Sequence, residues 1–334
     1  MQKIGVIGAG SWGTALADLL AKKGHAVTLW VHNAERVEEM RRTRINRVYL
    51  PELTFSPAIE ITSSLEQAVA GRECVLFVTP IQAMRQVMGE ASPHIPPGAS
   101  IVNASKGIEI NSMLTISGLC REILPSGLAD NYCVLSGPSF AREVAREMPT
   151  AIVAAAAEPA VARLVQENFS TDHFRVYTNR DVIGVELGGA VKNIISIAAG
   201  ICDGLGMGHN ARAALITRGL AEMARLGKAR GGRAETFAGL AGMGDLVLTC
   251  TGDLSRNRSV GMKLGEGMKL KEILGGMQMV AEGVKTTEAV FQLASSIGVE
   301  MPITRKVYEI LYEEKAPRQA VSELMTRLLK GEND

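Results

Sequence analysis

Three glycines, Gly8, Gly10 and Gly13, constrain the fold of this chain more than any other feature of its sequence. They lie in the segment Gly-Ala-Gly-Ser-Trp-Gly, between an apolar run at residues 3–7 and a helix-like stretch. In such a unit the first glycine makes a tight turn, the second lets the backbone approach a pyrophosphate, and the third lets helix and strand touch. A second strand-like run at 25–31 completes a unit of about 30 residues, which predicts a dinucleotide-binding site at a helix N-terminus.

The first part of the chain alternates short β-branched runs with longer helical patterns. This rhythm predicts a parallel sheet covered by helices on both faces. Runs such as 75–78 are apolar at consecutive positions, as strands buried on both sides should be. We therefore predict an α/β, Rossmann-like, doubly wound N-terminal domain over residues 1–182. Its strands are expected at residues 3–7, 25–31, 73–78, 99–103, 132–136, 150–154 and 174–178.

The second part of the chain shows a different periodicity. Apolar residues recur at spacings of three and four over 185–201, 211–226 and 284–297, which predicts helices. A last helix is expected near 320–329, followed by a frayed tail. We predict a mostly α-helical C-terminal domain over residues 183–334. Because no Pro- or Ser-rich linker separates the two parts, we expect them to pack together with a cleft between them.

The composition argues against several classes of function. The 36 basic residues are balanced by 35 acidic residues, so the chain lacks the basic excess of a nucleic-acid-binding or membrane-docking surface. We expect no apolar stretch to reach the roughly 18 residues of a membrane span, and the N-terminus lacks a signal-peptide pattern. The five cysteines form no C-x-x-C pair and no cluster with histidines, which predicts a reduced, cytoplasmic protein without a metal site.

A polar stripe on an otherwise apolar helix is the strongest candidate for a reaction site. It comprises Gly189, Lys192, Asn193, Ser196 and Gly200, which line up on one helix face. A buried ammonium group is costly unless it is paired or used, so Lys192 is predicted to face a ligand. A lysine that reaches solvent at the helix edge is the alternative.

Other candidate groups lie in glycine-rich or polar segments. Asp245 is the only charge in an apolar stretch, and it either holds an ammonium or hydroxyl group or caps a helix. Lys106 follows a predicted strand, where parallel sheets bind ligands. The segment 136–141 offers donors to an anion at the start of a helix, and the polar loop 255–258 contains two arginines that suit a phosphate. Cys250 is expected to be a buried core thiol.

The end of the second predicted strand bears on the cofactor. The residues there are Trp30, Val31, His32 and Asn33, where an acidic residue would normally hold the adenosine ribose of NAD. Without that carboxylate, NADPH should be accepted as well as NADH, with His32, Asn33 or Arg36 near the 2′-phosphate.

The chain resembles the bacterial NAD(P)-dependent sn-glycerol-3-phosphate dehydrogenase family. The resemblance rests on segments that occur in one order across nearly the whole chain: GAGSWGTALA, SKG, SGPSFA, GGAVKN, GLAGMGDLVLTC, SRNR and VAEGV. It implies a Rossmann domain followed by a helical domain. It also implies the reduction of dihydroxyacetone phosphate with NAD(P)H to sn-glycerol 3-phosphate, the backbone for phospholipid synthesis, with Lys192 as the catalytic lysine.

Together with the glycine turn and the helix stripe, the resemblance assigns residues to both ligands. Around the substrate these are Lys106, Gly137, Ser139, Lys192, Asn193, Asp245, Ser255, Arg256 and Asn257. Along the cofactor they are Gly8, Gly10, Ser11, Trp12, Gly13, His32, Tyr49, Lys106, Ala141, Arg256, Val280 and Glu282. The preference between NADPH and NADH is left open.

The sequence leaves two alternative functions open. A dehydrogenase of a small hydroxy acid would share the architecture but would need an arginine that binds a carboxylate. An NADPH-binding redox sensor would bind the cofactor and turn nothing over, with Lys192 in a structural role. The sequence does not fix the oligomeric state, for which a homodimer is one option, and it locates no regulatory site.

Overall fold

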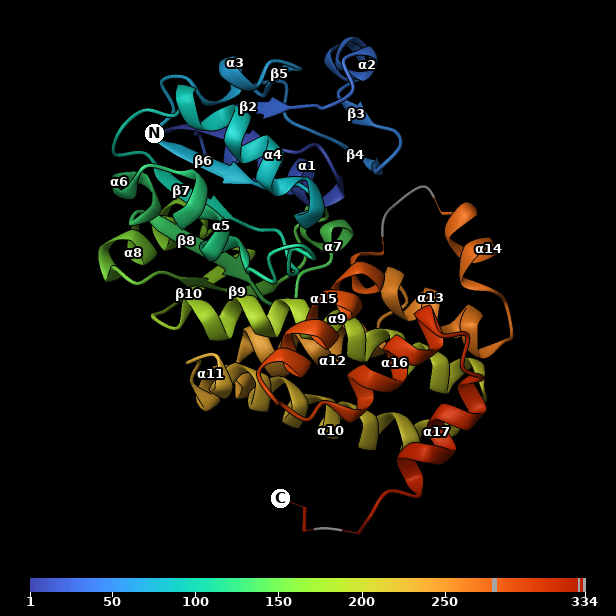
Figure 1. The fold of residues 1–334 in the computed structure, drawn as a ribbon. Coiled ribbons are helices and arrows are strands. Elements are labelled where there is room, and N and C mark those ends of the chain that lie inside the picture. The colour runs from blue at the N-terminus through green and yellow to red at the C-terminus, as the bar shows by residue number, and fades with distance from the viewer. Residues whose placement is uncertain (278–280, 330, 333–334) are drawn as a thin grey trace.

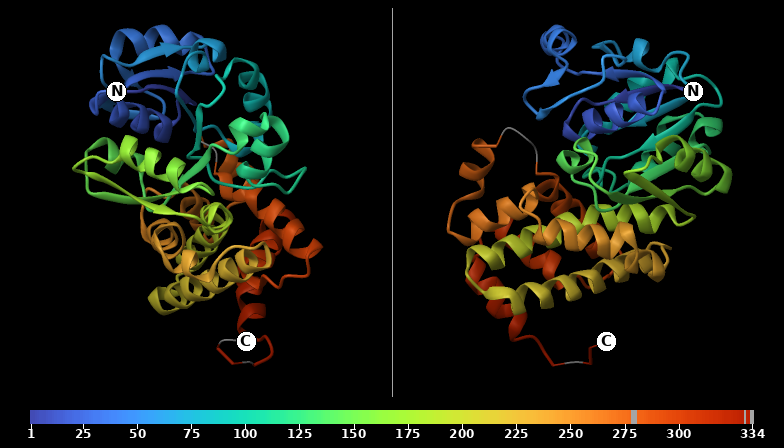
Figure 2. Two further views of the ribbon diagram at one scale, coloured as in Figure 1. Left: turned by 90° about the vertical axis from the view of Figure 1, so that its left-hand side faces the viewer. Right: turned by 180° about the vertical axis from the view of Figure 1, so that it is seen from behind.

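The computed structural model describes residues 1–277, 281–329 and 331–332, and the chain forms two parts stacked on each other (Figures 1 and 2). The upper part in Figure 1 is a sheet with helices on both faces, and the lower part is a group of helices. The predicted α/β N-terminal domain and helical C-terminal domain are therefore confirmed. Val280, one of the predicted cofactor residues, lies outside the described residues.

The N-terminal part contains all strands of the described residues. Its elements are β1 (Lys3–Ile7), α1 (Ser11–Lys22), β2 (Ala26–Trp30), α2 (Glu35–Thr43), β3 (Ile45–Asn46), β4 (Leu50–Thr54), β5 (Glu60–Thr62), α3 (Leu65–Val69), β6 (Cys74–Phe77), α4 (Ile81–Ala91), β7 (Ser100–Asn103), α5 (Ile116–Ile123), α6 (Ser126–Ala129), β8 (Tyr132–Ser136), α7 (Ala141–Ala145), β9 (Thr150–Ala155), α8 (Pro159–Phe169) and β10 (Phe174–Asn179).

All regular elements of the C-terminal part are helices in its described residues. Its elements are α9 (Val182–Gly204), α10 (Gly208–Ala229), α11 (Ala234–Ala238), a π-helical turn (Leu240–Gly244), α12 (Asp245–Thr251), α13 (Arg256–Gly265), α14 (Leu270–Gly275), α15 (Glu282–Ser296), α16 (Pro302–Tyr312) and α17 (Pro317–Met325). The last helix begins earlier than predicted, because the proline at its first turn is already suited to a helix start.

The sheet has eight strands in the order β10-β9-β8-β7-β6-β1-β2-β5, and every strand expected from the sequence is present. The predicted parallel sheet is interrupted by one antiparallel pair of strands. Strand β9 pairs antiparallel with β8, so β9 and β10 run opposite to the other strands. The connecting helix α7 has only five residues, too few to carry the chain back along the sheet, so the chain returns directly beside β8.

The parallel strands bring the candidate cofactor residues to one edge of the sheet. Parallel strands end at the same edge, so the glycine turn after β1, His32 after β2 and Lys106 after β7 lie along it. Strand β6 is buried at every position, as expected of a strand with a covered face on each side.

Helix α9 is the centre of the C-terminal part and packs against α10, α12, α13, α15 and α16. Its crossing with α13 depends on glycine. A Cβ atom at Gly200 would lie 2.0 Å from the carbonyl oxygen of Arg258, and one at Gly261 would lie 2.0 Å from that of Ile197. This close approach brings the start of α13 beside the polar stripe of α9.

Helix α9 also corrects one expectation from the sequence. By length and composition it could cross a membrane, since it has 23 residues and a window of mean hydropathy 1.5, so the expectation that no stretch is long enough was wrong. However, 89% of that window is buried inside the protein. A long, mostly apolar helix is typical of a protein core as well as of a membrane span, and here the neighbouring helices cover it.

Candidate active site

The glycine turn after β1 has the geometry that a pyrophosphate requires. Gly8 has φ +122, and a Cβ atom there would lie 2.7 Å from the carbonyl oxygen of Val78. A Cβ atom at Gly13 would lie 1.9 Å from the carbonyl oxygen of Gly8, so helix and strand touch there. An added Cβ at Gly10, the N-cap of α1, would meet nothing within 4 Å. This backbone geometry is the one expected of a turn that could hold a dinucleotide, and the binding itself stays a prediction.

The residues expected near the adenosine lie along the same edge. His32 is exposed just beyond β2, with its ring edge-on to Trp30 at 5.5 Å between centroids. The guanidinium of Arg36 lies 4.7 Å from the ring centre of Tyr49. Tyr49 had no motif of its own in the sequence, and this contact connects it to the first turn of α2, the helix that follows β2.

A single carboxylate joins two lysines where the two domains meet. Asp245 Oδ1 lies 2.6 Å from Lys192 Nζ, and Asp245 Oδ2 lies 2.5 Å from Lys106 Nζ. Lys192 Nζ also donates a hydrogen bond to Thr249 Oγ1 at 2.7 Å. The three charged groups come from α12, α9 and the segment after β7, and Asp245 is only 1% exposed. We call Lys106, Lys192 and Asp245 the lysine–aspartate cluster.

The cluster decides between the two interpretations of Asp245. It lies in the first turn of α12, whose N-cap is Gly244, and its carboxylate binds the two ammonium groups. A π-helical turn over Leu240–Gly244 leads directly into it, and such turns are frequent at functional sites. Thr249 was missed in the sequence; its signal is that it lies four residues after Asp245, on the same face of one helix.

Burial and charge together set the acidity of the cluster. Burial lowers the pKa of Lys192 to about 8, and the nearby Lys106 adds to this, while Asp245 acts in the opposite direction. Burial would raise the pKa of Asp245, but the two ammonium groups outweigh it and hold this pKa below its usual value. Near neutral pH the cluster therefore contains a carboxylate and a lysine that can gain or lose a proton with little free-energy cost.

The segment 136–141 holds Lys106 from the other side. The carbonyl oxygen of Gly137 accepts hydrogen bonds from Lys106 Nζ at 3.3 Å and from Ser139 Oγ at 3.0 Å. Gly137 has φ +144, and a Cβ atom there would lie 2.9 Å from Ile152 Cα. Ala141 begins α7, as the sequence predicted for this segment.

The segment 255–258 is the start of a helix and not a polar loop. Ser255 is the N-cap of α13, and its hydroxyl accepts a hydrogen bond from the backbone N–H of Arg258 at 3.2 Å. The guanidinium of Arg258 binds Asp203 at 2.8 Å and Asp253 at 2.9 Å, so it stabilises the helix crossing. Arg256 is exposed in the first turn of α13, and Asn257 Oδ1 accepts a hydrogen bond from Gly283 at 3.0 Å.

Glu282, at the start of α15, reaches across to the other domain. Its carboxylate accepts a hydrogen bond from the backbone of Ile81, the first residue of α4. Burial raises the pKa of Glu282 to about 7, against the attraction of Arg256, Lys106 and Lys192. Glu282 therefore lies within the electrostatic reach of the lysine–aspartate cluster, and its predicted contact with the cofactor stays a prediction.

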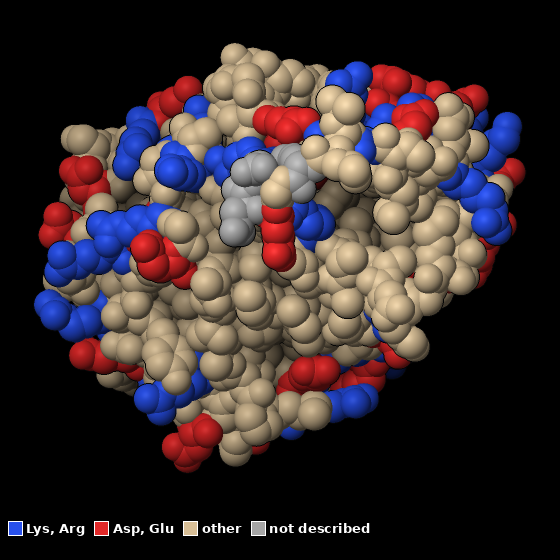
Figure 3. Space-filling model, turned by 90° about the horizontal axis from the view of Figure 1, so that it is seen from below, with Lys and Arg blue, Asp and Glu red and all other residues tan. Residues whose placement is uncertain are grey.

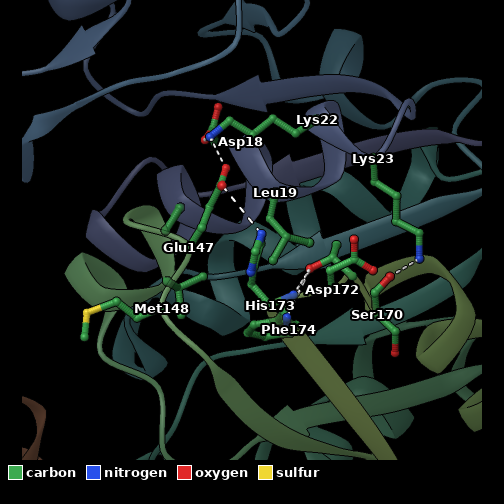
Figure 4. Close-up of a pocket in the computed structure, with 13 residues that line it drawn as sticks. Asp18, Leu19, Lys22, Lys23, Glu147, Met148, Ser170, Asp172, His173 and Phe174 are labelled. Carbon is green, nitrogen blue, oxygen red and sulfur yellow. Dashed lines mark hydrogen bonds and ion pairs between the residues drawn. The ribbon is translucent and has the colours of Figure 1, made fainter.

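The surface has a further cavity and a mixed distribution of charge (Figures 3 and 4). A cavity of about 420 Å³ opens between α1, α7 and the loop before β10 (Figure 4). In it Lys22 binds Asp18 at 3.1 Å and Glu147 at 2.8 Å, and Lys23 donates hydrogen bonds to the backbone carbonyls of Glu167 and Ser170. In Figure 3, basic and acidic side chains are interspersed on the face shown, with no continuous area of one sign. Neither feature has a buried lysine with a lowered pKa such as Lys192 in the lysine–aspartate cluster.

The fold and the site together define a class of protein. A glycine turn that fits a dinucleotide, and a buried lysine where a Rossmann-like sheet meets a helical domain, are typical of two-domain dinucleotide-dependent dehydrogenases. Family models described as NAD-dependent glycerol-3-phosphate dehydrogenase N-terminus and C-terminus match residues 3–162 and 181–322. The chain belongs to the NAD-dependent glycerol-3-phosphate dehydrogenase family.

Individual relatives match the chain over its whole length. It is 63% identical over 331 residues to glycerol-3-phosphate dehydrogenase (NAD(P)+) of Geobacter sulfurreducens, with 99% of each chain covered. It is 56% identical over 333 residues to the protein of the same name from Syntrophotalea carbinolica, with 100% of each covered. A crystal structure of glycerol-3-phosphate dehydrogenase from Coxiella burnetii superposes with a TM-score of 0.93 at 42% identity, covering 98% of this chain and 99% of that one.

Proposed function

We propose that this chain reduces dihydroxyacetone phosphate to sn-glycerol 3-phosphate with NAD(P)H, in a reversible hydride transfer that supplies the glycerol backbone of phospholipids. As a member of its family the chain is an NAD(P)-dependent oxidoreductase that acts on a small phosphorylated compound. The observation that carries the proposal is the lysine–aspartate cluster, which lies at the sheet edge that holds the glycine turn. We place the protein in the cytoplasm, and a homodimer stays a prediction.

We assign the proton transfer to Lys192. When bound, the reduced nicotinamide supplies the hydride. The Lys192 ammonium polarises the substrate carbonyl oxygen and donates a proton to it, which a pKa of about 8 allows near neutral pH. In the oxidising direction the neutral amine accepts the proton of the substrate hydroxyl. Asp245 orients Lys192 throughout, and Asn193 holds the hydroxyl.

We assign the substrate phosphate to the start of α13. Arg256 lies exposed in the first turn of α13. A guanidinium group can donate two parallel hydrogen bonds to the oxygens of one phosphate. Ser255 and Asn257 are held in place by hydrogen bonds to Ser196 at 2.9 Å and to Gly283 at 3.0 Å. Lys106, fixed by the segment with Gly137 and Ser139, adds a second positive charge.

We assign the cofactor to the sheet edge and divide the chain into residues 1–182 and 183–334. The glycine turn, with Ser11 and Trp12 at the start of α1, holds the pyrophosphate. His32, Tyr49 and Arg36 surround the adenosine. The residues that lie towards the nicotinamide are Lys106, Ala141, Arg256 and Glu282.

The test is the absorbance of NADPH, and then of NADH, after mixing with the protein and dihydroxyacetone phosphate. Loss of absorbance with the phosphate ester, and none with unphosphorylated dihydroxyacetone, supports the reaction and the phosphate site together. Equal rates with both ketones would contradict the phosphate assignment and favour a dehydrogenase of another small substrate. Cofactor binding without turnover would favour the redox sensor. The ratio of the two cofactor rates measures the preference that His32 and Arg36 set.

A further inference from the structure

A buried carboxylate outside the lysine–aspartate cluster ties α9 to the sheet domain. Glu186 lies in the second turn of α9 and is only 5% exposed. Its Oε1 accepts hydrogen bonds from the backbone N–H of Ser117 at 2.8 Å and from the hydroxyl of Tyr132 at 2.5 Å. Its Oε2 accepts one from the Ser117 hydroxyl at 2.6 Å. Ser117 belongs to α5 and Tyr132 begins β8, so one side chain connects three elements of two domains.

Glu186 acts as an N-cap for α5 from another domain. Thr115, at the N-cap position itself, makes no side-chain capping bond to the helix backbone. The N–H group of Ser117 in the first turn is bound by Glu186 instead. A carboxylate is favourable there because the helix N-terminus carries partial positive charge. Burial raises the pKa of Glu186, but the hydrogen bonds from Ser117, Tyr132 and Thr115 oppose this.

The following turns of α9 carry the proposed reaction site. A Cβ atom at Gly189, one turn after Glu186, would lie 3.3 Å from Lys106 Cγ and 3.0 Å from Ser136 Oγ, so the helix already touches the sheet edge there. Lys192 follows six residues after Glu186, which is about 9 Å along the helix axis. An α-helix is stiff over this distance, so the bonds of Glu186 also fix the position of Lys192 relative to the sheet.

We infer that Glu186 is a positioning residue for the hydride transfer: its bonds to α5 and β8 hold Lys192, on α9, in register with the cofactor that the sheet domain binds. The inference rests on the proposed function. Its physical basis is that the reaction needs groups from both domains, while only the packing between the domains sets their spacing. A displacement of about 1 Å at a reacting group can lower a rate by about 10²-fold.

The chain offers a matched control in Glu222. This glutamate of α10 is 3% exposed and binds the backbone N–H groups of Ile303 at 2.5 Å and Thr304 at 3.2 Å, at the start of α16. It too is a buried carboxylate that caps a neighbouring helix, but all of its partners lie within the helical domain. Comparing Glu186→Ala with Glu222→Ala therefore separates the loss of a buried cap from the loss of the connection between domains.

The measurements are kcat, the KM of each substrate, the melting temperature and the primary isotope effect with NADPH deuterated at the transferred position. Glu186→Ala should lower kcat by about 10–10²-fold and raise the isotope effect, because the hydride step becomes limiting. The KM for NADPH should change little, because the glycine turn is untouched. Glu222→Ala should lower the melting temperature without changing kcat or the isotope effect.

Glu186→Gln should restore most of the lost kcat. The amide oxygen can accept the bonds from the Ser117 N–H and Tyr132, while its N–H₂ group donates to the Ser117 hydroxyl, which can turn to accept it. A folded Glu186→Ala protein with wild-type kcat and isotope effect overturns the inference, and so does an equal loss in Glu222→Ala. If Glu186→Ala does not fold, the double variant Ser117→Ala and Tyr132→Phe carries the test, and unchanged kcat there overturns it. If the wild-type protein does not oxidise NADPH with dihydroxyacetone phosphate, the proposed function itself has failed.

Discussion

Replacing Asp245 with asparagine should shift the pH at which the reduction stops. Asp245 lies 2.6 Å from Lys192 and raises the lysine pKa that burial lowers, and the balance gives a pKa of about 8. An opposite charge in contact typically shifts a pKa by about 1–3 units. Asparagine keeps the volume but removes the charge, so the pKa of Lys192 should fall to about 5–7.

The effect on rate follows from the protonated fraction of Lys192. With a pKa of about 8, roughly three quarters of the lysine is an ammonium group at pH 7.5. With a pKa of about 6, only about 3% of the lysine is an ammonium group at pH 7.5. The loss of protonated lysine alone should therefore slow the reduction by roughly 25-fold at this pH. The proton donor is lost as the pH rises through the pKa. The descending limb of the reduction profile should therefore move to lower pH, and activity should recover on acidification.

The assay is kcat/KM for dihydroxyacetone phosphate as a function of pH, which reports groups of the free enzyme. Thr249→Val is the control, since it removes the hydrogen bond to Lys192 at 2.7 Å and leaves every charge in place. Its descending limb should stay near that of the wild type. If the descending limb of the Asp245→Asn profile lies at the same pH as in the wild type, or at higher pH, the reasoning that Asp245 sets the pKa of Lys192 is refuted.

Three further variants test other parts of the site. Lys192→Ala should lower kcat by about 10²–10⁴-fold in steady-state assays, with unchanged NADPH affinity by fluorescence; full turnover would remove the lysine from its role. Arg256→Ala should raise the KM for dihydroxyacetone phosphate by about 10–10²-fold, since a charged hydrogen bond contributes about 1.5–3 kcal/mol. An unchanged KM would contradict the phosphate assignment. Gly13→Ala would place a Cβ 1.9 Å from the Gly8 carbonyl oxygen, so thermal unfolding should show a loss of about 1–3 kcal/mol and NADPH titration a weaker complex. Stability and NADPH affinity equal to the wild type would show that the turn can relax.

The strands that could be predicted are the buried ones, because burial requires a run of apolar residues that is visible in the sequence. Strand β6 is buried at all positions, and its four residues are apolar. The hairpin of β3 and β4 and the edge strand β5 were not predicted, because β3 has two residues, β5 has three, and β4 is largely exposed. The direction of β9 could not be predicted either, since an apolar run has the same composition in both directions.

The site shows a similar division between local and distant signals. Lys192 stood out as an ammonium group in a polar stripe of an otherwise apolar helix, and Asp245 as the only charge in an apolar, glycine-rich segment. Their contact joins residues far apart in the chain, and no local pattern reveals it. The helix start at Ser255 could have been predicted, because serine is a preferred N-cap residue. The pairing of Arg258 with Asp203 could not, because it depends on the crossing of α9 and α13.

The charge of the lysine–aspartate cluster is the structural reason to prefer a phosphate ester over a hydroxy acid. The low pKa of Asp245 keeps its carboxylate ionised at neutral pH, so its one negative charge lies between two lysines and the cluster has a net positive charge when both lysines are protonated. This charge is in place before any substrate arrives, so it can stabilise both a phosphate dianion and the oxygen that gains charge during reduction. A carboxylate is recognised best by the planar fork of an arginine, whereas an ammonium group is a compact point charge without that geometry. Arg256, at the start of α13, acts on Glu282 together with Lys106 and Lys192. Its guanidinium suits phosphate as well as carboxylate oxygens, so the positive charge of the cluster, and not the arginine, favours the phosphate ester.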